Sequence, residues 1–238
     1  MPNSYLLKIT LKGSHHSIWR RFIVPSDIPL NQLHAVIQIV MGWDNYHMHS
    51  FIVGKQQYRS AKAIDVNPFG NECGDLPEEK HSLKSLASRK GAKIGYWYDF
   101  GDDWMHEIVV EDTNYTNPNW PYAVCCIEGA RACPPEDCGG VYGFFDFCKA
   151  MANPKHPEHK ELKSWVGGKY DPEYFDLAAV NKNLGVKKRS SPPKKEAVKK
   201  TAKKVIKKTT KKVAKKAAKK KPRGTWVFTG KPDKTRKD

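Results

Sequence analysis

Apolar and polar residues alternate near the start of the chain in a pattern typical of two β-strands. From Tyr5 to Leu11 every second residue is apolar, and a second apolar run extends from Ile18 to Val24. Gly13 and the polar residues after it separate the two runs. This arrangement predicts an antiparallel hairpin, and the proline that follows the second run marks its end.

The next apolar residues follow the period of a helix. Within residues 30–41 they recur three and four positions apart, so they share one face. Asp27 or Asn31 is placed to cap the start, and Gly42 stands where glycine is favoured after a helix end. His34 lies off the apolar face, where a surface or hydrogen-bonding role is expected. The spacing predicts a helix over residues 30–41.

Shorter patterned segments continue to about residue 186. The predicted strands cover residues 47–53, 96–100 and 104–111, and the predicted helices cover residues 82–89, 141–152 and 171–183. Residues 59–81 and 113–140 are rich in Asn, Gly and Pro and are expected to form loops. This order predicts an α+β fold over residues 1–186, a single domain with a mainly antiparallel sheet and packed helices.

Charge divides the chain into two unlike parts. The chain has 42 Lys and Arg against 25 Asp and Glu, a net charge of +17. Residues 187–238 contain 23 of the bases and three of the acids, which leaves the preceding residues with 19 bases and 22 acids. A uniformly basic DNA-binding fold is therefore excluded. Residues 187–238 cannot bury a core and are expected to be a disordered basic tail.

The tail contains six tandem tetrads over residues 197–220, each ending in a pair of lysines. Lysines four residues apart repel one another in a free helix, and phosphates remove that repulsion. The pattern resembles the tails of linker histones and of bacterial histone-like proteins, and it predicts sequence-independent binding to nucleic acid, with DNA favoured. A solubilising tail, or one that binds another polyanion or an acidic partner, is the alternative. The predicted contacts are Lys199, Lys200, Lys203, Lys204, Lys207, Lys208, Lys211, Lys212, Lys215, Lys216, Lys219 and Lys220.

The predicted hairpin between residues 96 and 111 carries the first set of candidate chemical groups. Asp99, Asp102 and Asp103 gather at its tip, and His106 follows on the second strand. These four residues are candidate catalytic groups. The alternative is a plain turn, in which Asp99 accepts hydrogen bonds from backbone amides, Gly101 supplies a positive φ and the next tryptophan packs in the core.

A second set of candidates has the side chains of a metal site. His47 and His49 are two apart on a predicted strand and so face the same side, and Glu136 and Asp137 lie in a loop rich in Pro and Gly. Carboxylates and imidazoles that converge from loops hold divalent ions in many phosphodiester-cleaving sites. These four residues are the candidate metal ligands, although no cofactor is predicted for the chain.

The cysteines give a weaker signal. The spacing Cys126-x6-Cys133-x4-Cys138 contains no CxxC pair, so it is a poor zinc pattern, and buried free thiols are expected in place of a zinc or redox site. Phosphate-binding GxxxxGK[ST] and GxGxxG loops, the GxSxG nucleophile motif and the HExxH metal motif are all missing from the sequence.

Several of these blocks together resemble the plasmid pRiA4b ORF-3-like family. The most specific are YxYDFGDxWxH at residues 96–106 and CPPEDxGG at residues 133–140. The resemblance extends over residues 4–184 and is also carried by residues 5–11, 18–21, 33–43 and 47–51. It implies an α+β domain of the kind found on plasmids and mobile elements, and it implies no established activity. The basic tail is not part of the family pattern.

These observations favour a non-enzymatic protein that associates with nucleic acid through its tail and whose body has an unknown ligand. One alternative is a metal-dependent enzyme that acts on nucleic acid through an Asp/His site, and another is an adaptor that binds an unidentified protein partner while tethered to DNA.

No apolar stretch is long enough for a membrane span, and the N-terminus does not have the pattern of a signal peptide. A cytoplasmic, nucleoid-associated location is expected, or a nuclear one in a eukaryote.

Overall fold

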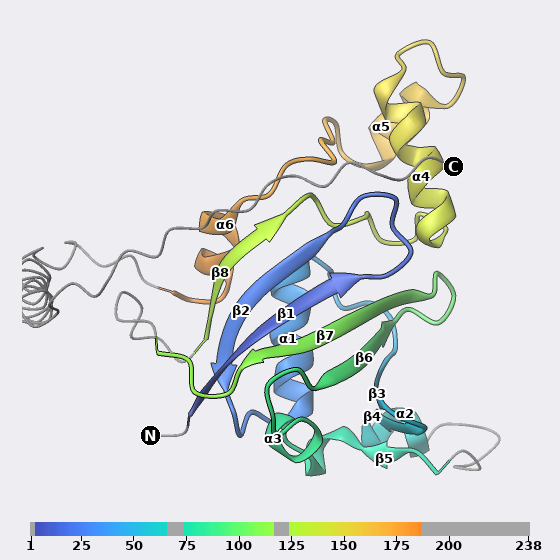
Figure 1. Ribbon diagram of the computed structural model, residues 1–238. Helices are drawn as coiled ribbons and strands as arrows, with labels where there is room; N and C mark the ends of the chain where they lie inside the picture. Colours follow the sequence, from blue (N-terminus) through green and yellow to red (C-terminus); the bar gives the residue numbers. More distant parts are fainter. Residues whose placement is uncertain (1–2, 66–73, 117–123, 187–238) are drawn as a thin grey trace, which may run out of the picture. The chain divides into compact units, whose positions relative to one another are not determined.

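The computed structural model describes residues 3–65, 74–116 and 124–186 (Figure 1). The predicted disorder of residues 187–238 and the lysine contacts within them lie outside these residues. All of the described residues belong to one compact unit, Met1–Ser190.

Helices are interspersed among the strands, and the last three elements of the described part of the chain are helices. The strands are β1 Ser4–Leu11, β2 Trp19–Pro25, β3 His49–Val53, β4 Gln56–Arg59, β5 Leu76–Pro77, β6 Lys93–Tyr98, β7 Trp104–Asp112 and β8 Cys125–Ala130. The helices are α1 Leu30–Met41, α2 Ala61–Asp65, α3 Leu83–Leu86, α4 Gly140–Ala152, α5 His159–Trp165 and α6 Leu177–Asn183, with a 3-10 turn at Glu78–Lys80.

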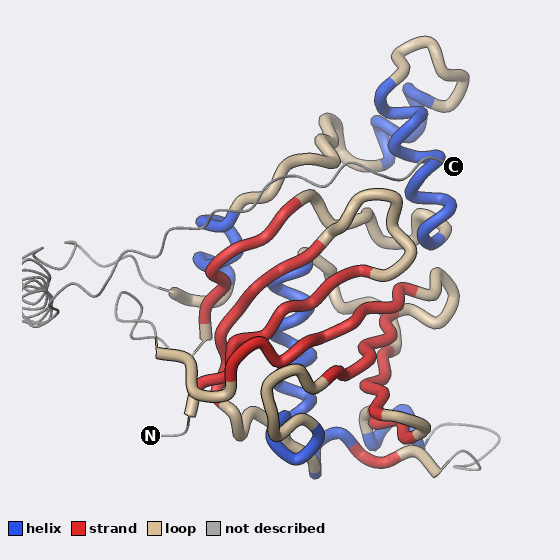
Figure 2. Tube along the Cα trace, in the orientation of Figure 1, coloured by secondary structure: helices blue, strands red, loops and turns tan. Residues whose placement is uncertain are grey.

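All eight strands belong to one sheet, in the order β5-β4-β3-β6-β7-β1-β2-β8 (Figure 2). Every neighbouring pair is antiparallel except β4 and β5, which pair in parallel. The α+β prediction with a mainly antiparallel sheet is confirmed. No helix among the described residues is long and apolar enough to cross a bilayer.

The first hairpin and the first helix follow the apolar pattern closely. Alternate residues of β1 are buried, as the period of two requires. Helix α1 covers residues 30–41, and Gly42 ends it with φ 106° and donates its N–H to the carbonyl of Gln38. The predicted cap at Asp27 or Asn31 is wrong, because Pro29 takes the N-cap position without a side-chain bond.

Three other predictions were wrong in part. Strand β8 lies inside the segment 113–140 that was expected to be a loop, and α2 and β5 lie inside the segment 59–81 that was expected to be another. The last helix begins at Leu177, where Asp176 caps it by accepting from the N–H of Ala179 (2.9 Å), and not at Asp171. Helix α5 was not predicted at all.

The core lies between α1 and the sheet (Figure 1). Leu33, Ile37 and Val40 of α1 belong to the same buried cluster as the inward side chains of β1, β6 and β7. At the edge strand β8, the side-chain amide of Asn181 from α6 exchanges two hydrogen bonds with the backbone of Cys126, at 2.8 and 2.9 Å. This pairing covers part of a sheet edge that would otherwise offer free backbone groups.

A buried arginine joins α1 to the sheet. Arg20 is 1 % exposed, and its guanidinium donates to the carbonyls of Val40, Trp19 and Ala130 at 2.7–2.8 Å. The ring of Phe175 lies 4.1 Å from the guanidinium carbon. Burial lowers the pKa of Arg20. Its cationic group stabilises the carbonyl end of α1, where the helix dipole is negative.

Replacement of Arg20 by methionine is expected to lower the free energy of unfolding by about 3 kcal/mol, because several buried carbonyls lose a charged donor. Arg21 offers a matched control on the same strand. It pairs with Glu111 and Glu128 on the partly exposed face, so Arg21→Met should cost about 1 kcal/mol or less. Urea denaturation measures both values, and equal losses would contradict this account.

Candidate metal centre

Three loops bring a histidine and three carboxylates together. His47 lies in the segment between α1 and β3, Asp99 lies in the turn between β6 and β7, and Glu136 and Asp137 precede α4. These segments are far apart in the sequence. The sheet places β3 beside β6, which brings the first two loops to the same end of the sheet.

The carboxylates surround one nitrogen of the histidine. His47 Nε2 lies 3.2 Å from Asp137 Oδ1, 3.6 Å from Asp99 Oδ2 and 3.7 Å from Glu136 Oε2. Donor atoms of His47, Asp99 and Asp137 all lie within 4.8 Å of one another. Two ligands that are each about 2.1 Å from an ion are roughly 3.0–3.4 Å apart. The distances from His47 Nε2 to the three carboxylates are therefore close to those between ligands in a coordination shell.

Two of the donor atoms are buried without a hydrogen bond. His47 Nε2 and Glu136 Oε2 have almost no exposed surface and no hydrogen-bond partner of acceptable geometry among the described residues. Buried polar atoms nearly always have a hydrogen-bond partner. These two atoms have none and lie 3.7 Å apart. A cation between them would satisfy both.

The second oxygen of each inner carboxylate is fixed by the protein. Glu136 Oε1 accepts from the N–H of Asp44 (2.8 Å) and from the hydroxyl of Tyr98 (2.9 Å). Asp99 Oδ1 accepts from the N–H of Gly101 (2.9 Å). These bonds orient the remaining oxygens towards His47, in the way that outer-shell bonds orient metal ligands. Burial and the neighbouring Glu136 carboxylate both raise the pKa of Tyr98, so its hydroxyl remains a donor.

The backbone at two of the carboxylates is in the left-handed region. Asp99 has φ 53° and Asp137 has φ 55°. The positive φ expected at Gly101 is wrong, because Asp99 and Asp103 make the turn in its place. Trp104 packs in the core as expected, with no exposed surface. Asparagine and aspartate tolerate this conformation better than other side chains, which fits their presence here.

A buried hydrogen-bond chain holds the loop that carries His47. Gln38 Nε2 donates to the hydroxyl of Tyr96, the hydroxyl donates to His34 Nδ1, and His34 Nε2 donates to Asn45 Oδ1, each at 2.8 Å. These donor assignments follow from the network, since the Gln38 amide nitrogen can only donate. His34 therefore has the hydrogen-bonding role expected for it, but it is buried and not on the surface. The chain links α1 and β6 to the loop two residues before His47.

The other residues of the β6–β7 hairpin do not join the centre. Asp102 Oδ2 accepts from the N–H of Gly139 (3.1 Å), and Asp103 is exposed. His106 is 1 % exposed, and its Nδ1 bonds to two backbone carbonyls of the hairpin at 3.0 and 3.3 Å. Of the four candidate catalytic residues, only Asp99 lies among the grouped donors.

His49 also lies apart from His47. His47 precedes β3, so the alternation of a strand does not place the two rings together. His49 Nε2 lies 2.8 Å from Glu78 Oε2, and its ring stacks on that of His34 with centroids 3.5 Å apart. Of the four candidate metal ligands, the structure groups His47, Glu136 and Asp137 and leaves His49, partly buried, beside Glu78.

Two buried histidines predict a loss of stability in acid. Burial lowers the pKa of His34 and of His106 to about 4. Below about pH 6.5 these two histidines bind protons in the unfolded chain but stay neutral in the folded chain. The free energy of unfolding therefore falls as the pH drops towards 4. The slope is up to about 1.4 kcal/mol per pH unit for each histidine.

Urea denaturation between pH 7 and pH 4 measures this slope. His106→Gln should reduce it by about half, because one of the two depressed pKa values is removed. Tyr142 is the control, since its side chain is 88% exposed, and Tyr142→Ala should leave the slope unchanged. The same slope in the His106 variant as in the parent would contradict the assignment.

The five described cysteines are free. Burial raises the pKa of Cys125 and Cys126 to about 11 and that of Cys138 to about 12. These thiols therefore stay protonated and behave as small apolar groups, as expected.

The orienting role of Tyr98 was missed by sequence reasoning. Its signal was the alternation of β6, which buries a phenol that then needs a hydrogen-bond partner.

Comparison with known proteins places this site within a family. The family model for plasmid pRiA4b ORF-3-like proteins matches residues 3–179, which include all four grouped donors. The chain belongs to the plasmid pRiA4b ORF-3-like family. The match ends before residues 187–238, so the lysine-rich segment is outside the family domain.

Two relatives of this family domain share most of its length. The uncharacterized protein y4hQ of Sinorhizobium fredii is 38% identical over 184 residues, which cover 74% of this chain and 88% of that protein. The crystal structure of MM3350, a protein of unknown function from Methanosarcina mazei Go1, matches with a TM-score of 0.62 and 31% identity. That match covers 73% of this chain and 95% of the other. The fold of this family member is therefore one already seen in a crystal.

Proposed function

We propose that this protein is a nucleic-acid-associated protein whose family domain binds a divalent cation. The observation that supports the cation is the grouping of His47, Asp99, Glu136 and Asp137 around buried donor atoms that lack hydrogen bonds. The observation that supports the nucleic acid is the net charge of +20 over residues 187–238, next to a body of net charge −3.

The donor set favours an ion of intermediate hardness. Three carboxylates and one imidazole suit Mn²⁺ or Zn²⁺, and carboxylates with added water suit Mg²⁺. The side chain of Asp137 is 69% exposed, whereas those of Asp99 and Glu136 are about 10% exposed. The ion would therefore have an inner side held by protein and an outer side open to water or a substrate.

The lysine segment supports association without sequence preference. Its tetrads contain twelve lysines and no acid, and each contact to a phosphate releases condensed counterions. The tetrads contain no arginine, asparagine or glutamine, and these side chains make many of the contacts that read base edges in the major groove. Affinity should therefore depend on salt far more than on sequence.

A salt titration on a labelled duplex tests the nucleic-acid part. With ten lysines engaged, the logarithm of the binding constant should fall against the logarithm of salt with a slope near −9. Residues 1–186 alone should bind weakly and with a shallow slope. Salt-resistant binding by residues 1–186 that matches the full chain would contradict the proposed division of roles.

Metal-dependent hydrolysis of phosphodiesters is a second candidate function, favoured by the open outer side of the centre. A cation there would polarise a phosphoryl oxygen and lower the pKa of a bound water. The test is incubation of single-stranded and duplex DNA and RNA with the protein and Mg²⁺, Mn²⁺ or Zn²⁺, beside the Asp99→Asn variant. If the DNA and RNA remain intact with all three ions, the hydrolysis proposal is wrong and the centre is a cation site without this activity.

A further inference from the structure

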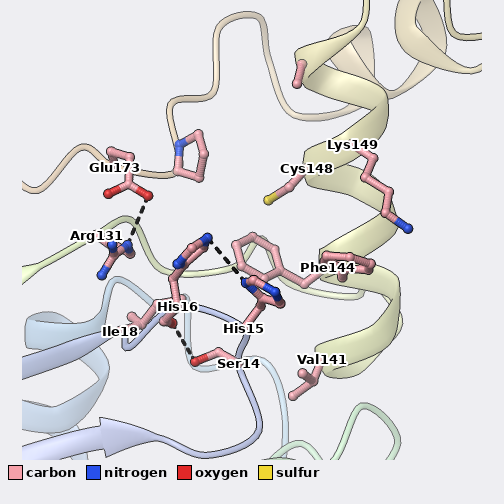
Figure 3. Close-up of a pocket in the computed structure, with 13 residues that line it drawn as sticks. Ser14, His15, His16, Ile18, Arg131, Val141, Phe144, Cys148, Lys149 and Glu173 are labelled. Carbon is pink, nitrogen blue, oxygen red and sulfur yellow. Dashed lines mark hydrogen bonds and ion pairs between the residues drawn. The ribbon is translucent and has the colours of Figure 1, made fainter.

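A cavity of about 330 Å³ lies between the β1–β2 turn, α4 and the segments that follow β8 and α5 (Figure 3). It shares no residue with the candidate metal centre. Its inner wall is apolar and consists mainly of Ile18, Val141 and Phe144. Figure 3 shows the sulfur of Cys148 pointing from α4 towards this space. Burial raises the pKa of Cys148 to about 11, so the neutral thiol adds to the apolar wall.

The mouth of the cavity carries nitrogen donors. His15 and His16 of the β1–β2 turn and Arg131 after β8 line it, and Figure 3 shows His16 between Arg131 and His15. Arg131 is held in place by Glu173 (2.9 Å) and by the carbonyl of Ser17 (3.2 Å). Four basic side chains line the cavity, and Glu173 is the single carboxylate among the lining residues.

Aromatic contacts fix the α4 side of the mouth. The ring of His15 stacks on that of Phe145, with centroids 5.7 Å apart. Lys149 Nζ lies 3.8 Å from the centre of the same Phe145 ring, and both residues belong to α4. Basic side chains and apolar side chains therefore line the same cavity.

We propose that this cavity binds a small organic anion with an apolar body and a single carboxylate or sulfonate head. The body would contact Ile18, Val141 and Phe144, and the head would accept hydrogen bonds from His15, His16 and Arg131. The volume lies within the range of small-molecule sites, which are mostly apolar with a few polar groups that fix orientation. The excess of donors over carboxylates at the mouth selects an anion over a neutral or cationic molecule.

The test uses the full chain and the fluorescent sulfonate 8-anilinonaphthalene-1-sulfonate, displaced by straight-chain carboxylates. Hexanoate, octanoate and decanoate should displace it with increasing strength, by up to about fourfold for each added methylene. Decanol and decyltrimethylammonium should be at least tenfold weaker than decanoate. Equal displacement by decanol, or no displacement by decanoate, would overturn the proposal.

Two variants separate binding from folding. Arg131→Gln keeps the cavity and removes its fixed cation, so decanoate should bind about tenfold more weakly while the circular dichroism spectrum is unchanged. Tyr142→Ala is the matched control on α4, since Tyr142 is 88% exposed and does not line the cavity. Its affinity should equal that of the parent. Unchanged affinity in the Arg131 variant would show that the mouth does not recognise the charge, and would overturn the proposal.

Discussion

Replacement of the twelve tetrad lysines by glutamine is expected to weaken binding to duplex DNA on the order of a thousandfold at low salt. Each lysine that contacts a phosphate releases counterions, so the loss of many contacts removes most of the favourable free energy. The twelve positions lie within residues 197–220, and the substitution leaves the family domain unaltered. The salt dependence should fall with the affinity, because both come from the same contacts. Fluorescence anisotropy over a range of salt concentrations measures both quantities.

The matched control replaces the same twelve lysines by arginine. This variant keeps the charge and should keep both the affinity and the salt slope within a few fold. A scrambled order of residues 197–220 should also bind, since charge and not tetrad register carries the interaction. Full affinity in the glutamine variant would show that another part of the chain binds nucleic acid.

Replacement of Glu136 by glutamine is expected to weaken Mn²⁺ binding by at least a hundredfold. Changes to outer-shell partners alone reduce metal affinity tenfold to a hundredfold, and this change removes a charged ligand. The glutamine can still accept from Asp44 and Tyr98 through its oxygen, so the loop should stay folded. Isothermal titration of the full chain measures the affinity. Thermal unfolding gives an independent value, since a ligand at a hundred times its Kd adds about 2.7 kcal/mol.

Asp102 supplies the control for the metal prediction. It lies on the same hairpin as Asp99 but accepts from the N–H of Gly139, and it is not among the grouped donors. Asp102→Asn should bind Mn²⁺ as the parent does. If Glu136→Gln also binds normally, the four side chains form an ion-pair cluster and the cation binds elsewhere.

Much of the fold was predictable because the periodic spacing of apolar residues in a strand or a helix depends only on nearby residues. The alternation in β1 and the helical spacing in α1 are set by residues within a few positions of one another, and both elements appear where the pattern places them. Strand β8 was missed because its pairing with β2 is made across about a hundred residues. Its sequence, with two cysteines and a glycine, has only weak strand character.

The candidate site was predictable as a set of residue types but not as a geometry. Sequence reasoning named His47, Asp99, Glu136 and Asp137 in two separate groups, and only the folded structure shows that they meet. It also paired His47 with His49, because it expected β3 to begin at residue 47. Since the strand begins at His49, that pairing had no structural basis.

The most direct measurement of the central claim is the anomalous scattering of Mn²⁺ in crystals of the protein grown or soaked with that ion. The account predicts a peak about 2.2 Å from His47 Nε2 and from the carboxylate oxygens of Asp99 and Asp137, with Glu136 Oε2 bound to the same ion. Crystals at millimolar Mn²⁺ that show no peak among these side chains would contradict it.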